Sequence, residues 1–163
     1  MTQLLILCVE DEPEVRDALV RDLEPFATAF QIEPAEDVAD ARQVVEEHLA
    51  AGGRLALALC DHVMPGTSGV DFLVELNGNP ATAKARKVLV TGQAGLEDTV
   101  KAVNRADLDH YIAKPWSIEE LHAIVRRQLS QFVIEEVEDL LPYVQVLDGP
   151  ALLAAIRSRK EQE

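Results

Sequence analysis

Short apolar runs alternate along this chain with longer segments in which apolar residues recur at helical spacing. The runs Leu4–Val9, Leu55–Cys60, Val88–Val90 and the weaker Tyr111–Ala113 lack strict alternation of polar and apolar residues. That pattern is typical of strands buried on both faces of a parallel sheet. Phe30–Ala35 is a poorer candidate and supplies the fifth predicted strand.

Segments with helical spacing follow each of these runs. The predicted helices are Val15–Leu23, Val38–Leu49, Gly69–Leu76, Leu96–Ala106 and Ile118–Leu129. Pro13 stands at a helix start, and Ser117 with Glu120 three residues later forms a capping-box pattern. Because strand and helix alternate five times, the sequence predicts the α/β class. We expect an open, doubly wound parallel sheet with right-handed crossovers and helices on both faces.

The pattern changes after about residue 131. Apolar residues keep helical spacing until Pro142 interrupts it, and a second short helix is predicted to begin near Asp148, with Pro150 in its first turn. We therefore expect one domain at residues 1–131 and a helical C-terminal extension at 132–163. The extension is open to three roles: docking onto its own domain, a dimerisation interface, or a linker to a further domain. Self-association is the favoured one.

Polar residues of related chemistry follow four of the five predicted strands. They are Glu10, Asp11, Asp61, Thr91 and Lys114. Ligands of doubly wound sheets bind at the carboxyl ends of the strands, so we expect these side chains to converge on one edge. Neighbouring carboxylates repel one another and are stable mainly when a hard cation neutralises them, and carboxylate oxygens suit Mg²⁺.

A carboxylate held beside Mg²⁺ can attack an activated phosphoryl group and form an acyl phosphate. The Lys114 ammonium would then stabilise the equatorial phosphoryl oxygens together with the metal. The Thr91 hydroxyl can hydrogen-bond the phosphoryl group, and Gly92 beside it leaves access open. Lys114 and Thr91 are therefore candidate catalytic residues.

Four motifs occur in order, each closing a predicted strand. They are Val9-Glu10-Asp11-Glu12, Asp61-His62-Val63-Met64-Pro65 with Gly69, Val90-Thr91-Gly92, and Tyr111-Ile112-Ala113-Lys114-Pro115. With these motifs the chain resembles the response-regulator receiver family over roughly residues 3–130. The resemblance implies a flavodoxin-like, five-stranded parallel sheet in the order 2-1-3-4-5. It also implies a role in bacterial two-component, or phosphorelay, signal transduction.

The resemblance further implies roles for the site residues. Asp61 would be the phosphoacceptor, and the donor would be a sensor histidine kinase or a phosphotransfer protein. Asp11 and Asp61 would bind Mg²⁺ directly, and Glu10 through a water molecule. The backbone carbonyl of Val63 would complete the set of protein ligands, and Mn²⁺ would substitute for Mg²⁺.

A conformational switch is also implied by the resemblance. Thr91 would move toward the phosphoryl group, and Tyr111 would swing inward into the space that Thr91 vacates. The face formed by 96–106, 111–113 and 118–129 would then change shape. No enzymatic or DNA-binding motif follows the predicted domain, so we expect a non-enzyme that acts by protein–protein contact. The downstream target stays unidentified, and a homodimer is one possible output.

Two residues depart from the family's commonest pattern. Glu10 stands where Asp is more frequent, and Val63, two residues after Asp61, is apolar. Because Val63 cannot hold a hydrolytic water by a side-chain hydrogen bond, our hypothesis is that self-dephosphorylation is slow.

Composition narrows the set of partners. The 15 basic and 29 acidic residues give a formal charge of -14, which repels nucleic-acid phosphates and anionic membranes, so we expect neither as a partner. Cys8 and Cys60 lie in apolar runs and are predicted to be reduced core residues. Leu4–Val9 is too short for a signal peptide or a membrane span, so we expect a cytoplasmic protein.

Two other functions compete with the receiver hypothesis. An aspartyl-phosphate hydrolase of the haloacid-dehalogenase type needs a second Asp two residues after the nucleophile, where Val63 stands. A phosphorylation-independent interaction module would need neither the acidic pair nor Thr91 and Lys114. Trp116 is open to two interpretations, a partner anchor or a partly buried residue at a helix start.

Overall fold

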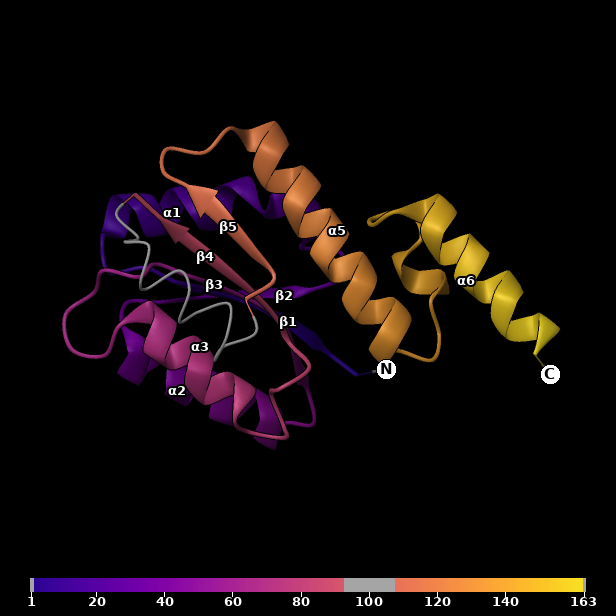
Figure 1. Cartoon of the computed structure of the whole chain (residues 1–163), viewed down its shortest axis with the longest axis horizontal. Coiled ribbons are helices and arrows are strands. Elements are labelled where there is room, and N and C mark those ends of the chain that lie inside the picture. Colours follow the sequence, from indigo (N-terminus) through magenta and orange to yellow (C-terminus); the bar gives the residue numbers. More distant parts are fainter. Residues whose placement is uncertain (1, 93–107, 163) are drawn as a thin grey trace.

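A parallel five-stranded sheet forms the centre of the molecule (Figure 1). The computed structural model describes residues 2–92 and 108–162. The strands are β1 (Leu4–Val9), β2 (Gln31–Ala35), β3 (Arg54–Cys60), β4 (Arg86–Thr91) and β5 (His110–Ala113). Their order is β2-β1-β3-β4-β5, and each neighbouring pair is parallel. The predicted flavodoxin-like order is confirmed.

Helices cover both faces of this sheet. They are α1 (Pro13–Asp22), α2 (Val38–Ala50), α3 (Gly69–Asn77) and α5 (Ile118–Glu136). A further helix, α6 (Gly149–Glu161), and two short 3₁₀ turns, η1 (Glu24–Phe26) and η2 (Leu141–Tyr143), complete the described elements. The helix predicted at Leu96–Ala106 lies outside the described residues. Helices α1 and α5 lie on one face, and α2 and α3 on the other (Figure 1).

Strand β1 shows why the apolar runs have no polar alternation. All six of its residues are buried. Ile6 and Cys8 pack in the apolar cluster with α1 and α5, whereas Leu5 and Leu7 pack in the cluster with α2 and α3. Side chains of a strand alternate between the two faces, so a strand covered on both faces must be apolar throughout.

Local hydrogen bonds set the helix boundaries. The Ser117 side chain accepts a hydrogen bond from the Glu120 backbone N–H at the start of α5, as the sequence predicts for an N-cap. Pro13 occupies the first turn of α1, where its missing N–H costs no hydrogen bond. Gly52, with a φ of 88°, ends α2 in the left-handed region that glycine adopts without steric cost.

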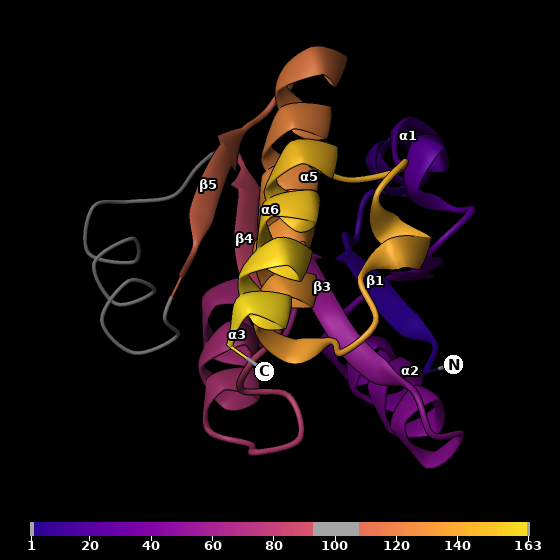
Figure 2. The ribbon, with the colours of Figure 1, turned by 90° about the vertical axis from the view of Figure 1, so that its right-hand side faces the viewer.

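Helix α5 continues to Glu136, so the boundary expected between residues 131 and 132 falls inside it. Phe132 and Val133 are fully buried in the core. After η2 the chain turns back, and α6 lies beside α5 on the side away from the sheet (Figure 2). Residues Leu140, Tyr143, Leu147 and Leu152 of the extension belong to the apolar cluster beneath α1 and α5.

Polar contacts hold both ends of α6 against α5. The Ser130 hydroxyl accepts a hydrogen bond from the Asp148 backbone N–H at 3.0 Å, where α6 begins. Near the other end, the Arg159 guanidinium donates to the backbone oxygens of Val137 at 3.1 Å and Glu138 at 2.9 Å. These carbonyls lie just beyond the end of α5, so a cation there is favourable. The extension is thus packed onto its own domain.

Candidate functional site

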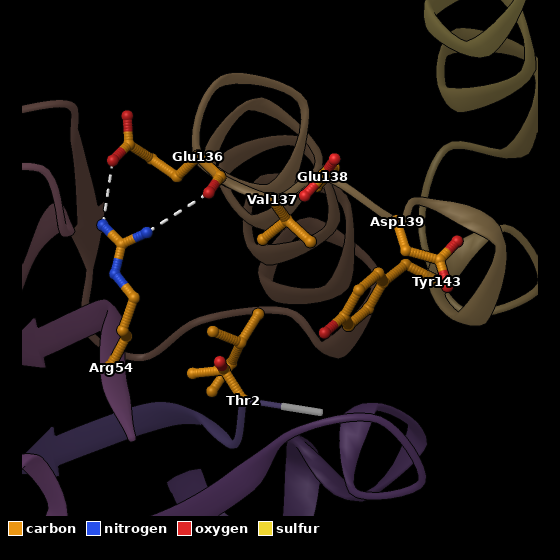
Figure 3. Close-up of a pocket in the computed structure, with 8 residues that line it drawn as sticks. Thr2, Arg54, Glu136, Val137, Glu138, Asp139 and Tyr143 are labelled. Atoms are coloured by element: carbon orange, nitrogen blue, oxygen red, sulfur yellow. Dashed lines mark hydrogen bonds and ion pairs between the residues drawn. The ribbon is translucent and has the colours of Figure 1, made fainter. Parts of the chain in front are cut away.

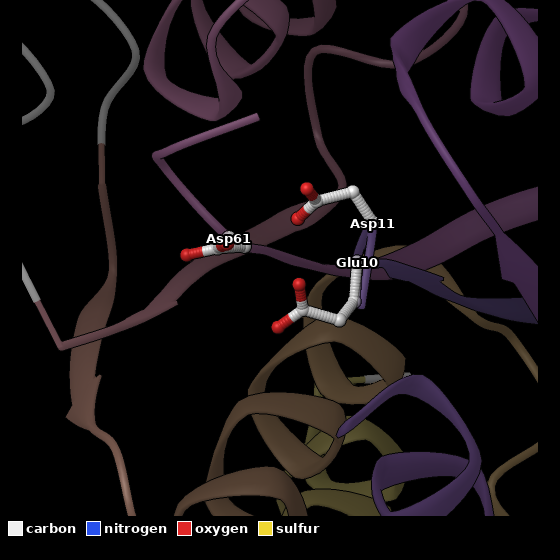
Figure 4. Close-up of side chains that lie close together, drawn as sticks. All are labelled: Glu10, Asp11 and Asp61. Carbon is white, nitrogen blue, oxygen red and sulfur yellow. The ribbon is translucent and has the colours of Figure 1, made fainter. Parts of the chain in front are cut away.

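Three carboxyl groups meet at the carboxyl edge of the sheet (Figure 4). Glu10 and Asp11 directly follow β1, and Asp61 directly follows the neighbouring strand β3. One carboxylate oxygen from each of the three lies within 4.8 Å of the others. Among the described residues this is the one group of acidic, histidine or cysteine side chains close enough to hold a metal ion.

The backbone around Asp61 is fixed by a close approach of α3. Gly69, the first residue of α3, lies so near that a Cβ on it would stand 1.9 Å from the Asp61 carbonyl oxygen. The Asp61 backbone N–H donates to the Val9 carbonyl oxygen at 2.9 Å, which links the two acidic strand ends. Only glycine fits at position 69, and it keeps the loop after β3 folded over the helix start.

Burial makes the acidic cluster electrostatically costly. Glu10 is 2% exposed and Asp61 5% exposed. Burial raises the pKa of Glu10, and the Asp61 carboxylate adds to that rise, whereas hydrogen bonds from Lys114 and from the Glu12 backbone N–H oppose it. The Asp11 Oδ1 atom is buried and has no hydrogen-bond partner among the residues that the structure describes.

Lys114, which follows β5, reaches across to this cluster. Its ammonium is ion-paired with Glu10 and lies 3.4 Å from Asp61 Oδ2. Burial alone would lower the pKa of Lys114, but the Glu10 hydrogen bond and the Asp61 charge raise it overall. Lys114 therefore stays an ammonium, and it is the cation that the described part of the chain supplies to the three carboxylates.

A small cavity opens beside the cluster. It has a volume of about 190 Å³ and is lined by Glu12, Asp61, Val63, Thr91, Gly92 and Lys114. Thr91 is the last residue of β4 and is 1% exposed, while the Val63 side chain is 54% exposed at the rim. The cavity thus brings Asp61, Thr91 and Lys114, predicted from three different strand ends, around one space large enough for a phosphoryl group.

Tyr111 lies on β5, which β4 separates from the strand β3 that precedes Asp61, and it is 37% exposed. Its hydroxyl donates a hydrogen bond to the Thr91 backbone oxygen at 3.0 Å. The side chain therefore points outward in this structure while remaining bonded to the end of β4, whose last residue lines the cavity.

One neighbour of the site was missed in the sequence, and another was left open there. Arg16 donates to the Glu10 carbonyl oxygen at 3.0 Å from the first turn of α1, a contact that no motif signals. Trp116 donates from its indole N–H to Asp22 at 3.0 Å and lines a groove of about 440 Å³ with Val15 and Pro115. Trp116 is thus partly buried, although it also faces an open groove.

The charge balance of the cluster fits a divalent cation. Three carboxylates face one ammonium, and Asp11 Oδ1 lacks a partner among the described residues. Oxygen ligands of this number suit a hard cation such as Mg²⁺. The residues present therefore fit the metal that the sequence predicts, with Glu10, Asp11 and Asp61 as its acidic pocket.

Cysteine and histidine side chains outside the acidic cluster have structural roles. Cys8 and Cys60 are buried free thiols on opposite faces of the sheet, and burial raises the pKa of Cys8 to about 12. His48 and His122 bond to backbone oxygens. Among the described residues, no helix combines the length and apolar character needed to cross a bilayer.

Comparison with known proteins identifies similar chains. A model of the response regulator receiver domain family matches residues 6–126. The phosphate regulon transcriptional regulatory protein PhoB of Escherichia coli is 33% identical over 138 residues, which cover 83% of this chain and 57% of PhoB. The hydrogenase transcriptional regulatory protein HoxA of Cupriavidus necator is 30% identical over 128 residues, which cover 78% of this chain. The aligned residues make up 24% of HoxA, so the chain spans only part of either relative.

Solved structures show the same fold. A CheY-like receiver domain protein from Methanospirillum hungatei superposes with a TM-score of 0.70 at 26% identity, covering 82% of this chain and 99% of that one. The response regulator TrrA of Thermotoga maritima, solved in complex with Mg(2+)-BeF, gives a TM-score of 0.61 at 26% identity. The second match covers 78% of this chain and 99% of TrrA.

Proposed function

Because this chain belongs to the response regulator receiver domain family, we propose that it is a phosphorelay switch whose phosphoacceptor is Asp61. The observation that carries the proposal is the arrangement around one cavity of the Asp61 carboxylate, the Lys114 ammonium and the Thr91 hydroxyl. An acidic cluster suited to a divalent cation adjoins that cavity. The donor is a sensor histidine kinase or a phosphotransfer protein.

The proposed reaction is an in-line transfer. An Asp61 carboxylate oxygen attacks the phosphorus of a phosphohistidine, a P–O bond forms, and the P–N bond breaks as the histidine nitrogen regains a proton. Asp61 suits this role because it is buried at the cavity and held from both sides, by Gly69 and by the end of β1. Positioning of this kind replaces a bimolecular encounter with a fixed geometry.

The metal pocket consists of Glu10, Asp11 and Asp61, with the backbone carbonyl of Val63 as a further proposed ligand. Mg²⁺, or Mn²⁺ in its place, supplies charge neutralisation for phosphoryl oxygens when it is bound. Asp11 Oδ1, which has no partner within the part of the chain that the structure describes, supports this assignment, because a buried carboxylate oxygen without a partner is costly.

Lys114 and Thr91 act on the phosphoryl group. The Lys114 ammonium lies 3.4 Å from Asp61 Oδ2 and would stabilise the negative oxygens that collect there during transfer. The Thr91 hydroxyl would then donate to the phosphoryl group of the product. Because Val63 carries no hydrogen-bonding group at the rim, nothing on that side chain can orient a water for hydrolysis, and we propose a long-lived aspartyl phosphate.

Output follows from the link between Thr91 and Tyr111. Movement of Thr91 toward the phosphoryl group would strain or break the hydrogen bond from the Tyr111 hydroxyl to the Thr91 carbonyl and let Tyr111 turn inward. The surface of β5 and α5 would change with it. We propose a non-enzymatic, cytoplasmic protein that signals through this surface to a protein target, or through a homodimer.

For residues 132–163 we propose an intramolecular element rather than a linker. Six of its residues lie in the apolar core, and polar contacts fasten both ends of α6 to α5. Light scattering with and without phosphorylation would test the homodimer, because dimerisation through β5 and α5 predicts a doubled mass on phosphorylation.

Intact-mass spectrometry after incubation with acetyl phosphate tests the central proposal. Wild type should gain one phosphoryl group only in the presence of Mg²⁺ or Mn²⁺, and hydroxylamine should remove it, as expected of an acyl phosphate. Asp61→Asn should gain none, whereas Asp71→Asn, an exposed aspartate on α3, should behave as wild type. A stable adduct on Asp61→Asn would contradict the assignment.

A further inference from the structure

A second cavity lies at the opposite edge of the sheet, where the extension meets the domain (Figure 3). Its volume is about 230 Å³. Thr2, Leu4 and Arg54 line it from the N-terminal ends of β1 and β3, and residues 136–139 with Tyr143 line it from the extension. Because drug-sized ligands occupy roughly 300–1,000 Å³, this cavity suits a smaller molecule.

Tyr143 gives the cavity an unsatisfied polar group. The residue is 2% exposed, and its ring packs at 5.5 Å from the ring of Phe30. The hydroxyl has no hydrogen-bond partner within residues 2–92 and 108–162, and Figure 3 shows it directed toward Thr2 on the other side of the cavity. The hydroxyl itself is accessible from the cavity, so it can hydrogen-bond a molecule that enters there.

The charges around the cavity determine whether it favours a positively or a negatively charged ligand. Among the described residues that line it, Arg54 is the one cation, and it is already bonded to the Glu136 carboxylate at 2.8 Å and to the Glu136 carbonyl at 3.2 Å (Figure 3). The Arg54 guanidinium also stacks over the Phe132 ring at 5.2 Å. Glu138 and Asp139, both exposed, add two further carboxylates to the lining, and one oxygen of Asp139 accepts a hydrogen bond from the Leu141 backbone N–H at 3.2 Å. An anion would therefore meet a net negative lining, and a cation would be attracted.

Apolar surface completes the lining. Leu4 is 1% exposed, and Val137 and the Tyr143 ring stand beside it. We propose that this cavity binds a small organic ammonium compound, with its charged group near the carboxylates and the Tyr143 hydroxyl and its hydrocarbon part against Leu4 and Val137. Such a ligand would bridge the domain and the extension. The proposal does not depend on phosphorylation of Asp61, which lies at the other end of β3.

Three probes of equal chain length test the proposal on the full chain. Pentylammonium, 1-pentanol and pentanoate differ only in the polar group at one end. In two-dimensional amide NMR spectra, pentylammonium should shift the signals of Thr2, Val137 and Tyr143 in a saturable manner at millimolar concentrations. Pentanol should bind more weakly, and pentanoate should give no saturable shift there.

Variants of lining residues identify the contacts. Tyr143→Phe keeps the ring and the packing but removes the hydroxyl, so pentylammonium binding should weaken about threefold to tenfold, the range of one hydrogen bond. Glu138→Gln should weaken it about twofold to fivefold. Glu46→Gln, at an exposed glutamate on α2 that does not line the cavity, is the matched control and should leave binding unchanged.

Four outcomes would overturn the proposal. They are equal binding of pentanol and pentylammonium, preferential binding of pentanoate, pentylammonium binding that Tyr143→Phe leaves unchanged, and no saturable shift with any probe. Because Tyr143→Phe conserves the buried ring, its amide spectrum also reports directly whether the fold is retained.

Discussion

The two ends of the central strands differ in how their charges are balanced. At the carboxyl ends, three carboxylates face the single ammonium of Lys114, and the pKa of Glu10 is raised by burial. At the amino ends, Arg54 pairs with Glu136, and Arg86 pairs with Asp109 at 2.8 Å. Local rules of charge pairing are violated mainly where a protein binds or reacts, so the excess of carboxylates supports the carboxyl end as the proposed phosphorylation site. The closed ion pairs of the amino end, called the balanced end below, join β3 to α5 and the start of β4 to the segment before β5.

The extension packs against the amino end of the sheet, and two adjacent leucines of α6 test how much this packing stabilises the fold. Leu152 is fully buried, whereas Leu153 is 42% exposed. Leu152→Ala should lower the free energy of unfolding by about 2–5 kcal/mol, because it leaves a cavity in the core. Leu153→Ala should lower it by less than about 1 kcal/mol.

Urea denaturation followed by circular dichroism measures both values. Equal, small losses for the two variants would mean that α6 does not stay packed on α5 in solution. The same experiment would then restore the linker interpretation of residues 132–163.

At the carboxyl end, the corresponding test removes the Lys114 ammonium, the cation that the described residues bring to the three carboxylates. Lys114→Met should slow phosphorylation by acetyl phosphate about 10²- to 10³-fold, the loss that follows removal of one charge-stabilising donor. Lys84→Met is the matched control, because Lys84 is exposed and lies before β4 at the balanced end. Time courses of intact mass would measure both rates, and a Lys114→Met rate within twofold of wild type would contradict the role given to Lys114.

A substitution at the rim of the same site should accelerate a reaction, the hydrolysis of the aspartyl phosphate, and the expected change is smaller than that for Lys114. Val63→Asn introduces a hydrogen-bonding side chain that can hold a water, so the aspartyl phosphate should hydrolyse roughly ten- to a hundredfold faster. Val63→Ala, which stays apolar, should keep the wild-type lifetime. Release of inorganic phosphate from the purified phosphoprotein gives the rates, and a wild-type half-life of seconds would already refute the slow-hydrolysis hypothesis.

The two ends of the sheet also differ in how many of their residue contacts can be predicted from the sequence. The site residues directly follow buried strands. Because the carboxyl ends of parallel strands lie at one edge of the sheet, the sequence predicts that Glu10 and Lys114, which are 104 positions apart, meet there. The pairing of Arg54 with Glu136 could not be predicted this way, since it depends on where α5 ends and how the chain turns back. The expected boundary at residue 131 followed a change of pattern, but Phe132 and Val133 keep the helical spacing of α5 and extend it.

Tyr143 allows the last test, because it is the polar group at the balanced end that lacks a partner among the described residues. Burial raises the pKa of Tyr143 above 10.0, and the nearby Asp139 carboxylate raises it further. Above pH 10 the unfolded chain therefore loses the phenol proton while the folded chain keeps it. The folded state then binds more protons, and stability must fall with rising pH by at most about 1.4 kcal/mol per pH unit from this group. Tyr143→Phe has no phenol group and so lacks this pH dependence. Its thermal stability should therefore fall less between pH 9 and pH 11 than that of wild type. Identical losses would mean that Tyr143 is solvated and that the extension is open.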